Sequence, residues 1–355
     1  MSTTNADHGA ADIPGDDGLY GIAVPTTRAA VVLLPVPFDA TTSYGRGTVD
    51  GPRAILRAST QVDLYDVETG EPHRAGIVML PESAAVRAWN ERARTAARRV
   101  IDAGEDAANA SVVQARNEVN ALSTRLQEWV ETEVERWLDA GKIVGLVGGD
   151  HSVSYGTLVA HARRFPELGI LHVDAHADLR HEYQGFTWSH ASIMENVMRR
   201  LPNVARLVQV GIRDLCAEEN SRIQNSGGRI RTYFDTQLTH ERFEGATWGD
   251  QVTRIVDELP QDVFVSFDVD GLDATLCPHT GTPVPGGLSF HQASYLVGAV
   301  ARSGRRIVGF DLVEVAPDPG GSEWDGNVGA RLLYKLIGWT LRSRAGAQAA
   351  RGEAP

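Results

Sequence analysis

Acidic and histidine residues alternate in the stretch HVDAHADLRH, which covers residues 172–181. Its central members are Asp174, His176 and Asp178. In an extended backbone, side chains at alternate positions point to the same side, so these three groups would face one ligand. If the chain turns there, they can still converge, although the spacing alone does not require it. Carboxylate and imidazole groups collected in this way suit metal binding and proton transfer.

Two further motifs place the same residue types after apolar runs. VGGDHS, residues 147–152, supplies Asp150 and His151, and SFDVDGLDA, residues 266–274, supplies Asp268, Asp270 and Asp273. Ligands of open α/β sheets bind beyond the carboxyl ends of the strands, so we expect the three motifs to meet at one edge of a sheet. An aspartate at a strand end also commonly caps the next helix, and Asp150 and Asp273 are open to that structural interpretation.

Converging carboxylates would repel one another and lose hydration unless cations balance them. Oxygen and nitrogen ligands without thiolate suit divalent first-row metals such as manganese, nickel, iron or zinc. The candidate ligands outnumber the needs of one ion, so two ions about 3.5–4 Å apart, bridged by carboxylate and water, fit better. These candidates are His151, Asp174, His176, Asp178, Asp268 and Asp270.

The elements that must position these residues are short apolar runs rich in β-branched side chains, which predict strands buried on both faces. The runs cover residues 29–36, 142–147, 169–174, 205–212, 262–268 and 306–315. Helical patterns lie between them, at residues 153–165, 191–201, 248–259, 290–304 and 329–344. This alternation predicts a three-layer α/β/α fold with a mostly parallel sheet.

Residues 83–140 break the alternation, because they contain two helical stretches and no strand pattern. Gly104 and the following EDAANAS suit a turn between the two helices. Apolar residues recur in the second stretch at steps near three and four, at Val119, Leu122, Leu126, Trp129, Val134 and Trp137. We expect a helical hairpin packed on the sheet, with a place at a subunit contact as an option, rather than a catalytic element.

Composition limits the classes of function. The chain has 355 residues, 42% of them hydrophobic, which suits one catalytic domain over residues 29–343 between flexible segments 1–28 and 344–355. A net charge of −12 argues against nucleic acid and is compatible with metal ions and a cationic substrate. Cys216 and Cys277 lack CxxC spacing, which fits a reducing, cytoplasmic compartment. No apolar run reaches the length of a membrane span.

The motifs GGDHS, DAHADLR and SFDVDGLDA resemble the three signature motifs of the ureohydrolases, the superfamily of arginase, agmatinase, formimidoylglutamase and guanidine hydrolase. Residues 37–55, 279–287 and 311–317 also resemble motifs of that family. The resemblance covers about residues 30–340, is interrupted by the hairpin, and implies an arginase-like fold. One departure is Ala274, where the family commonly has proline, but this position lies beyond the expected ligands.

Carried over residue by residue, the resemblance implies a site with two divalent metal ions per chain, manganese or nickel. One ion would be held by His151, Asp174, Asp178 and Asp268, and the other by His176, Asp174, Asp268 and Asp270, so that Asp174 and Asp268 bridge. His190 matches the proton-transfer histidine, Glu314 the acid that holds the guanidinium, and Thr282 the threonine of the TGTP signature. Asp178 counts with His190 and Glu314 among the catalytic residues. We expect His161, His172 and His181 not to be ligands.

The implied reaction is attack of a metal-bridging hydroxide on a guanidinium carbon, which gives urea and an amine or ammonia. The loop of residues 179–189, LRHEYQGFTWS, differs from the arginase loop and resembles the agmatinase-like branch that includes guanidine hydrolases. Trp188, Tyr183, Phe186 and His279 could narrow the pocket around a small substrate, although Trp188 could equally be a packing residue. We expect guanidine, a small substituted guanidine or a biguanide, with agmatine as the main alternative.

Other classes remain open on the sequence alone. A formimidoylglutamase-like enzyme would share the motifs, and a deacetylase could share the fold with one zinc ion. A non-catalytic partner subunit would be expected to lack ligands, whereas all of the candidates are present here. The family suggests a homo-oligomer, a trimer or a hexamer, and a hetero-oligomer with a related subunit is an alternative.

Overall fold

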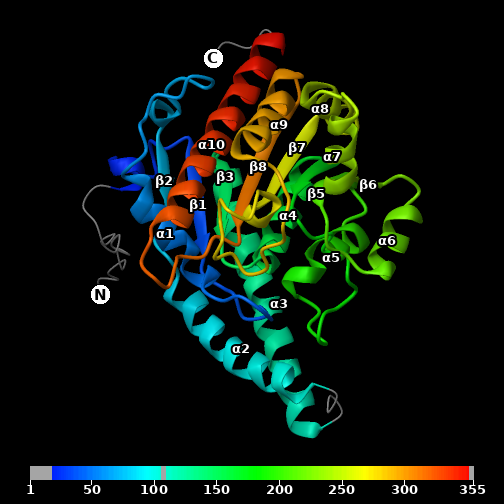
Figure 1. Ribbon diagram of the computed structural model, residues 1–355. Helices are drawn as coiled ribbons and strands as arrows, with labels where there is room; N and C mark the ends of the chain where they lie inside the picture. Colours follow the sequence, from blue (N-terminus) through cyan, green and yellow to red (C-terminus); the bar gives the residue numbers. More distant parts are fainter. Residues whose placement is uncertain (1–17, 105–108, 352–355) are drawn as a thin grey trace, which may run out of the picture.

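The computed structural model describes residues 18–104 and 109–351, and all further statements concern these residues. Its centre is one eight-stranded sheet in which every pairing is parallel, as the sequence predicts (Figure 1). The order across the sheet is β2-β1-β3-β8-β7-β4-β5-β6. The strands are β1 Val31–Val36, β2 Ile77–Met79, β3 Ile143–Gly148, β4 Leu168–Val173, β5 Val204–Ile212, β6 Ile230–Phe234, β7 Asp262–Asp268 and β8 Arg306–Val313.

The two outermost strands, β2 and β6, are not among the predicted ones. β2 has only three residues, so it carries too short an apolar run to be recognised. β6 reads IRTYF, and only Ile230 in it is fully buried. An edge strand covered on one side does not need the continuous apolar sequence that marks the central strands.

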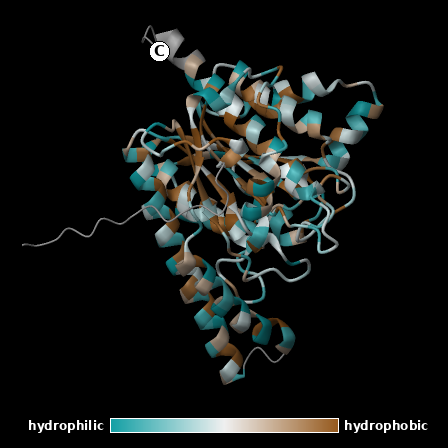
Figure 2. Cartoon of the chain, turned by 90° about the vertical axis from the view of Figure 1, so that its left-hand side faces the viewer, coloured by the Kyte–Doolittle hydropathy of each residue, from teal (hydrophilic) through white to brown (hydrophobic). Residues whose placement is uncertain are grey.

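Helices cover both faces of the sheet. On one face, α1 Gly51–Ser59, α8 Trp248–Asp257, α9 Phe290–Arg302 and α10 Trp324–Arg351 pack against the strands in a single large apolar cluster. On the other face lie α3 Ala110–Asp139, α4 Tyr155–Arg164 and α5 Ile193–Arg200. The shorter helices α6 Ala217–Gln224 and α7 Asp235–Phe243 flank β6. Apolar residues are concentrated in the sheet between these layers (Figure 2).

The predicted helical hairpin is confirmed as α2 Ala84–Ala103 and α3, which lie antiparallel and project beyond the sheet (Figure 1). Val119, Leu122, Leu126 and Val134 are buried, and Trp129 and Trp137 pack partly buried against the cluster below the sheet. The half of α3 nearest the sheet therefore belongs to the core. Part of the predicted turn, residues 105–108, lies outside the described residues.

The packed part of the chain extends past both predicted boundaries. Residues 1–17 and 352–355 lie outside the described residues, but Leu19 and Tyr20 are buried, and the Tyr20 hydroxyl donates to Ala330 O at 3.1 Å. The side chains of these two residues pack in the same apolar cluster as α10. The prediction that residues 1–28 form a flexible segment is therefore wrong for Leu19 and Tyr20. The boundary at residue 343 falls within α10. Across residues 18–104 and 109–351, no helix combines the length and apolarity that crossing a membrane requires.

Candidate metal centre and active site

Four neighbouring strands at the middle of the sheet deliver the predicted site residues. In the order β3, β8, β7, β4 their carboxyl ends lead to His151, Glu314, Asp268 and Asp174. His151 begins the short 3-10 helix His151–Ser154, Asp268 is the last residue of β7, and Asp270 lies in the next 3-10 helix, Val269–Gly271. Parallel strands end at the same edge, so residues far apart in sequence meet there.

The first group gathers around the Nδ1 atom of His151. Nδ1 lies 3.1 Å from Asp174 Oδ2, 3.2 Å from Asp178 Oδ2 and 3.5 Å from Asp268 Oδ2. All four side chains are buried. Asp178 has φ +55°, a left-handed conformation that aspartate tolerates better than most residues, and it turns the chain back so that its carboxylate joins Asp174. The stretch 174–178 is therefore not a simple extended strand.

The second group gathers around the Nδ1 atom of His176. Nδ1 lies 3.0 Å from Asp270 Oδ2 and 3.5 Å from Asp174 Oδ1. Asp174 thus presents one oxygen to each histidine. Asp268 presents one oxygen to the first group, while its Oδ1 accepts the backbone N–H of Asp270 at 2.8 Å. Thr282 donates its hydroxyl to Asp270 Oδ2 at 3.3 Å, which places this predicted substrate contact at the rim of the second group.

Hydrogen bonds behind His151 assign its tautomer. Its Nε2 atom lies 2.9 Å from Ser266 Oγ, and the Ser266 hydroxyl donates to the Asp311 carboxylate at 3.0 Å. Since the serine proton goes to Asp311, Nε2 of His151 must be the donor to Ser266. In the neutral ring Nδ1 then carries the lone pair, which is the form in which a metal ion binds it. Without an ion, burial lowers the pKa of His151, but hydrogen bonds with Asp174, Asp178 and Asp268 outweigh it and raise this pKa well above its usual value.

His172 lies against the cluster, with Nε2 2.8 Å from Asp174 Oδ2. Gln209 donates its amide to Ala177 O at 2.7 Å and to Nδ1 of His172 at 3.0 Å. Because Nδ1 accepts, Nε2 carries the proton and donates it to Asp174. This histidine therefore orients Asp174 by a hydrogen bond. Its ring also lies close enough to His151, Asp174 and Asp178 for the four to form one group of possible metal ligands, so its expected absence from the ligand set stays a prediction. Sequence reasoning missed this supporting role, although His172 continues the alternation of 174, 176 and 178.

The cluster holds more carboxylates than positive charges. In the described part of the chain, its carboxylates form ion pairs with histidine side chains and with no Lys or Arg side chain. Burial and the charge of Asp174 raise the pKa of Asp178 to about 6, and burial with Asp270 raises the pKa of Asp268 well above its usual value. Burial alone would lower the pKa of His176, but Asp270 and Asp174 raise it to about 12. Two groups of histidine and carboxylate side chains, in which the carboxylates outnumber the positive charges, fit divalent cations.

Glu314 follows β8 in a left-handed conformation, with φ +65°, which is uncommon for a long side chain. Its backbone is fixed by Gly149 O, which accepts its N–H at 2.8 Å, and by the hydroxyl of Thr280, which donates to its carbonyl oxygen at 2.8 Å. Oε1 accepts the backbone N–H of His151 at 2.9 Å. Oε2 is buried and lacks a hydrogen-bond partner among the described residues.

His190 begins a short 3-10 helix, His190–Ser192, beside the cluster. Its Nδ1 lies 3.4 Å from the hydroxyl of Thr41, which also donates to Asp150 Oδ2 at 3.3 Å. The ring of Tyr183 meets it edge to face at 6.0 Å between centroids. Burial, with the nearby charge of His176, lowers the pKa of His190 to about 4. Thr41 is a second residue that sequence reasoning missed, since only the fold brings residues 41 and 190 together.

The structure separates two predicted substrate contacts from the cluster. Trp188 is buried and donates its indole N–H to Thr124 Oγ1 at 2.9 Å. Its ring packs at a tilt against Tyr155, with 4.7 Å between the ring centroids, so these contacts make it a packing residue. Both ring nitrogens of His279 face carboxylates, Asp325 at 2.9 Å and Asp318 at 3.2 Å. Asp150 and Asp273 accept backbone N–H groups two residues ahead, at Ser152 and Thr275, which is the structural role left open for them.

An all-parallel α/β/α sheet that gathers histidines and carboxylates at the ends of its central strands is typical of a metal-binding protein of the α/β class. Over residues 29–338 the sequence matches the arginase family. It is 33% identical over 315 residues to the N(1)-aminopropylagmatine ureohydrolase of Thermus thermophilus, covering 88% of this chain and 91% of that protein. To the agmatinase of Salmonella enteritidis PT4 it is 32% identical over 307 residues, 86% of each.

Solved structures of proteins named as ureohydrolases share the fold. The crystal structure of the agmatine ureohydrolase of Thermoplasma volcanium superposes with a TM-score of 0.70 at 22% identity, covering 94% of this chain and 97% of that one. The chain belongs to the arginase family. It is a hydrolase of the ureohydrolase class, which acts on amidine C–N bonds, and this part of the sequence prediction is confirmed.

Proposed function

We propose that the protein is a binuclear metal-dependent amidinohydrolase that releases urea from a small cationic guanidino compound. The observation that carries this proposal is Glu314 Oε2, a buried acceptor without a partner among the described residues, beside the histidine–carboxylate cluster. A guanidinium is planar, cationic and rich in N–H donors, so it satisfies such an oxygen in both charge and hydrogen bonding. An ideal Cβ at Gly281 would lie 3.0 Å from this oxygen, so the glycine leaves room there.

In this proposal, His151, Asp174, Asp178 and Asp268 hold one ion, and His176, Asp174, Asp268 and Asp270 hold the other. Manganese and nickel are the candidate metals, since both accept this oxygen and nitrogen ligand set. Bound ions would lower the pKa of a water molecule and so supply a nucleophile at neutral pH. The supporting hydrogen bonds that His172 donates to Asp174 and that His151 donates to Ser266 would keep two of the candidate ligands in place.

The protein's own residues bind the substrate and move the proton. Glu314 orients the guanidinium, so that its carbon faces the cluster and a C–O bond can form. His190, which burial keeps neutral, can accept a proton and return it to the departing nitrogen as the C–N bond breaks. The products balance as urea and an amine, or ammonia when the substrate is guanidine itself.

For the substrate, we propose guanidine, a substituted guanidine or a biguanide, with agmatine as the second candidate. The loop of residues 179–189 supports the first group, because it departs from the arginase loop. The relatives named as agmatinase and N(1)-aminopropylagmatine ureohydrolase favour the second. Two of the aromatic residues expected to narrow the pocket, Trp188 and Phe186, are instead buried in packing contacts, so pocket width must be measured by activity.

The test is a urea assay on protein loaded separately with manganese and with nickel. The panel comprises guanidine, methylated guanidines, a biguanide, agmatine, arginine and guanidino acids. We expect urea from at least one member, and a loss of about a hundredfold or more in kcat/KM for Glu314→Gln, which keeps the shape and removes the charge. Protein that binds two metals per chain and releases no urea from any member of the panel would disprove the proposal.

A further inference from the structure

The loop between the second signature motif and His190, residues 179–190, is here called the substrate loop. It turns tightly at Gln184 and Gly185, both with positive φ, +54° and +79°. Tyr183 and Phe186 flank this turn and exchange backbone hydrogen bonds, at 3.3 Å and 2.9 Å. Two successive positive φ values are typical of a type I′ turn, which sends the chain straight back on itself. Tyr183 and His190 are thereby brought together at 6.0 Å between ring centroids.

Phe186, which follows the tip of the substrate loop, is buried against the hairpin rather than against the sheet. The fully buried ring of Phe186 lies in an apolar cluster whose other members all belong to α2 and α3: Ala96, Ala97, Val100, Val112, Ala115 and Val119. The cluster contains no residue of the central sheet. Burial of a phenylalanine ring stabilises a contact by roughly 1.5–3 kcal/mol, so the hairpin is a substantial support of this loop.

Asn120 of α3 binds the backbone of the loop on both sides of Phe186. Its Oδ1 accepts the N–H of Thr187 at 3.0 Å, and its Nδ2 donates to Gly185 O at 3.2 Å. One turn further along α3, Thr124 accepts the indole N–H of Trp188 at 2.9 Å. The Asn120 side-chain amide thus pairs with two peptide groups, as the backbone of a neighbouring strand would. These two hydrogen bonds hold the backbone of the substrate loop against α3.

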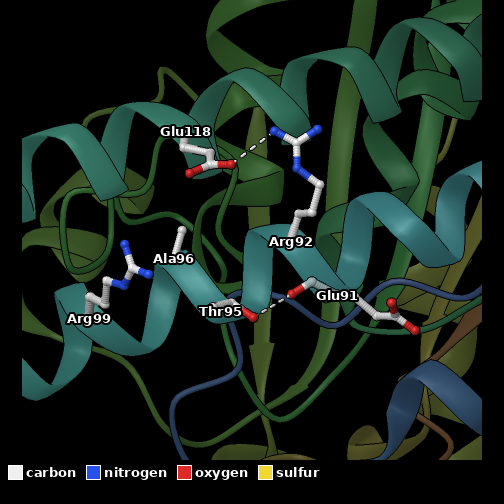
Figure 3. A pocket seen from close by; sticks show the side chains of 6 residues that line it. All are labelled: Glu91, Arg92, Thr95, Ala96, Arg99 and Glu118. Atoms are coloured by element: carbon white, nitrogen blue, oxygen red, sulfur yellow. Dashed lines mark hydrogen bonds and ion pairs between the residues drawn. The ribbon is translucent and has the colours of Figure 1, made fainter.

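The hairpin also contacts a second segment at the site, the loop after β1 that contains Asp39 and Thr41. The Asp39 N–H donates to Asn90 Oδ1 at 2.8 Å, and the Asp39 carboxylate pairs with Arg94, both of them on α2. Two residues later Thr41 contacts His190. The two helices are joined to each other by Arg92 and Glu118 at 3.0 Å, across a surface hollow of about 310 Å³ lined also by Glu91, Thr95, Ala96 and Arg99 (Figure 3).

We propose that Asn120 is a positioning residue for the reaction. Through it the hairpin sets the substrate loop, and with it Tyr183 and His190, at the distance from the metal cluster that the substrate requires. This inference rests on the proposed function. It gives the hairpin a role in substrate placement, although no hairpin residue among those described contacts the cluster of predicted ligands directly.

The experiment compares Asn120→Ala with Asn117→Ala, the same substitution on an exposed residue of the same helix. Alanine favours helix, so neither change should unfold α3. Hydrogen exchange is measured for the amide of Thr187, with KM, kcat and metal content measured on the best substrate of the panel. Asn120→Asp keeps the acceptor for Thr187 and loses the donor to Gly185, and serves as the partial rescue.

We expect Asn120→Ala to exchange the Thr187 amide about tenfold faster, and to lower kcat/KM by about tenfold or more, at unchanged metal content. Asn117→Ala should match the wild type, and Asn120→Asp should restore most of the amide protection. Wild-type exchange in Asn120→Ala, or faster exchange with wild-type kinetics, would overturn the proposal. Failure of the proposed function would differ from both, because the wild type itself would then release no urea.

Discussion

At the scale of single residues, Asp268 occupies the most demanding position in the cluster. Its Oδ2 lies 3.5 Å from His151 Nδ1, and its Oδ1 accepts the N–H of Asp270. Burial and the charges of Asp270 and Asp174 raise its pKa well above the usual value. Such a carboxylate is unfavourable in the ionised form unless a cation lies beside it, and a bridging position between two ions would provide that cation.

We therefore predict that Asp268→Ala lowers the metal content from about two ions per chain to one or none, because both ions lose a ligand. Metal analysis after extensive dialysis measures this directly. Asp273→Ala is the matched control, since Asp273 lies in the same motif and its side chain accepts hydrogen bonds from Thr275 of its own turn. Full occupancy in Asp268→Ala would refute the bridging role.

Residue type and position were enough to predict that the six candidate ligands lie together, because acids and histidines at strand ends are recognisable in sequence. The residues that support them were not predictable. Ser266, Asp311 and Gln209 are ordinary polar residues within strands, and their roles depend on which strand lies beside which. For Trp188 the sequence left two interpretations open, a substrate contact and a packing residue. In the structure its indole N–H donates to Thr124, which fits the packing residue.

At the scale of elements, α4 packs on the sheet through a buried histidine. His161 lies against Gly309 of β8, where an added Cβ would come within 2.2 Å of His161 Nε2, so only glycine fits. Its Nδ1 donates to Thr157 O at 2.8 Å, and Nε2 is buried without a partner among the described residues. Burial lowers the pKa of His161 from 6.5 to about 4, so the packed ring is neutral.

We predict that this contact weakens in acid. The unfolded chain gains a proton on His161 near pH 6.5 and the folded chain only near pH 4, so the stabilising contribution is complete above about pH 6.5 and is lost as the pH falls toward 4. Between pH 7 and pH 5, the contribution of His161 to the free energy of unfolding falls by about 2 kcal/mol. His161→Leu should remove this pH-dependent part of the free energy of unfolding, measured by urea denaturation at both pH values.

The control for His161→Leu is His240→Leu, because His240 is exposed on α7. That variant should keep the pH dependence of the wild type. If His161→Leu and the wild type lose equal stability between pH 7 and pH 5, the buried histidine does not link α4 packing to pH.

Central elements were predictable and peripheral ones were not. The six strands at the centre of the sheet are buried on both faces, so their sequences are continuous apolar runs. β2 and β6 at the edges lack that pattern. The hairpin was found from the periodicity of α3, but its contact with the substrate loop depends on Phe186, whose burial between two helices leaves no mark in the sequence.

At the scale of the whole molecule, the protein has a net charge of −12 and concentrates buried carboxylates at the centre of its sheet. The four strands that carry them, β3, β8, β7 and β4, form the middle of the sheet. Repulsion within the cluster therefore acts on the core of the fold rather than on a peripheral loop. Ions that bind only the folded chain stabilise it by mass action, by about 2.7 kcal/mol at a hundred times the dissociation constant.

We predict that chelator-treated protein has a melting temperature several degrees below that of the metal-loaded protein, and that added manganese or nickel restores it as the logarithm of concentration. The restored shift should be smaller at pH 5.5 than at pH 7.5, because the carboxylates and histidines must lose protons to bind an ion. Thermal unfolding at matched ionic strength measures both effects. Asp268→Ala separates site binding from general charge screening, since it keeps the remaining surface charge and should show little shift. Equal melting temperatures with and without ions would show that the cluster does not couple metal binding to folding.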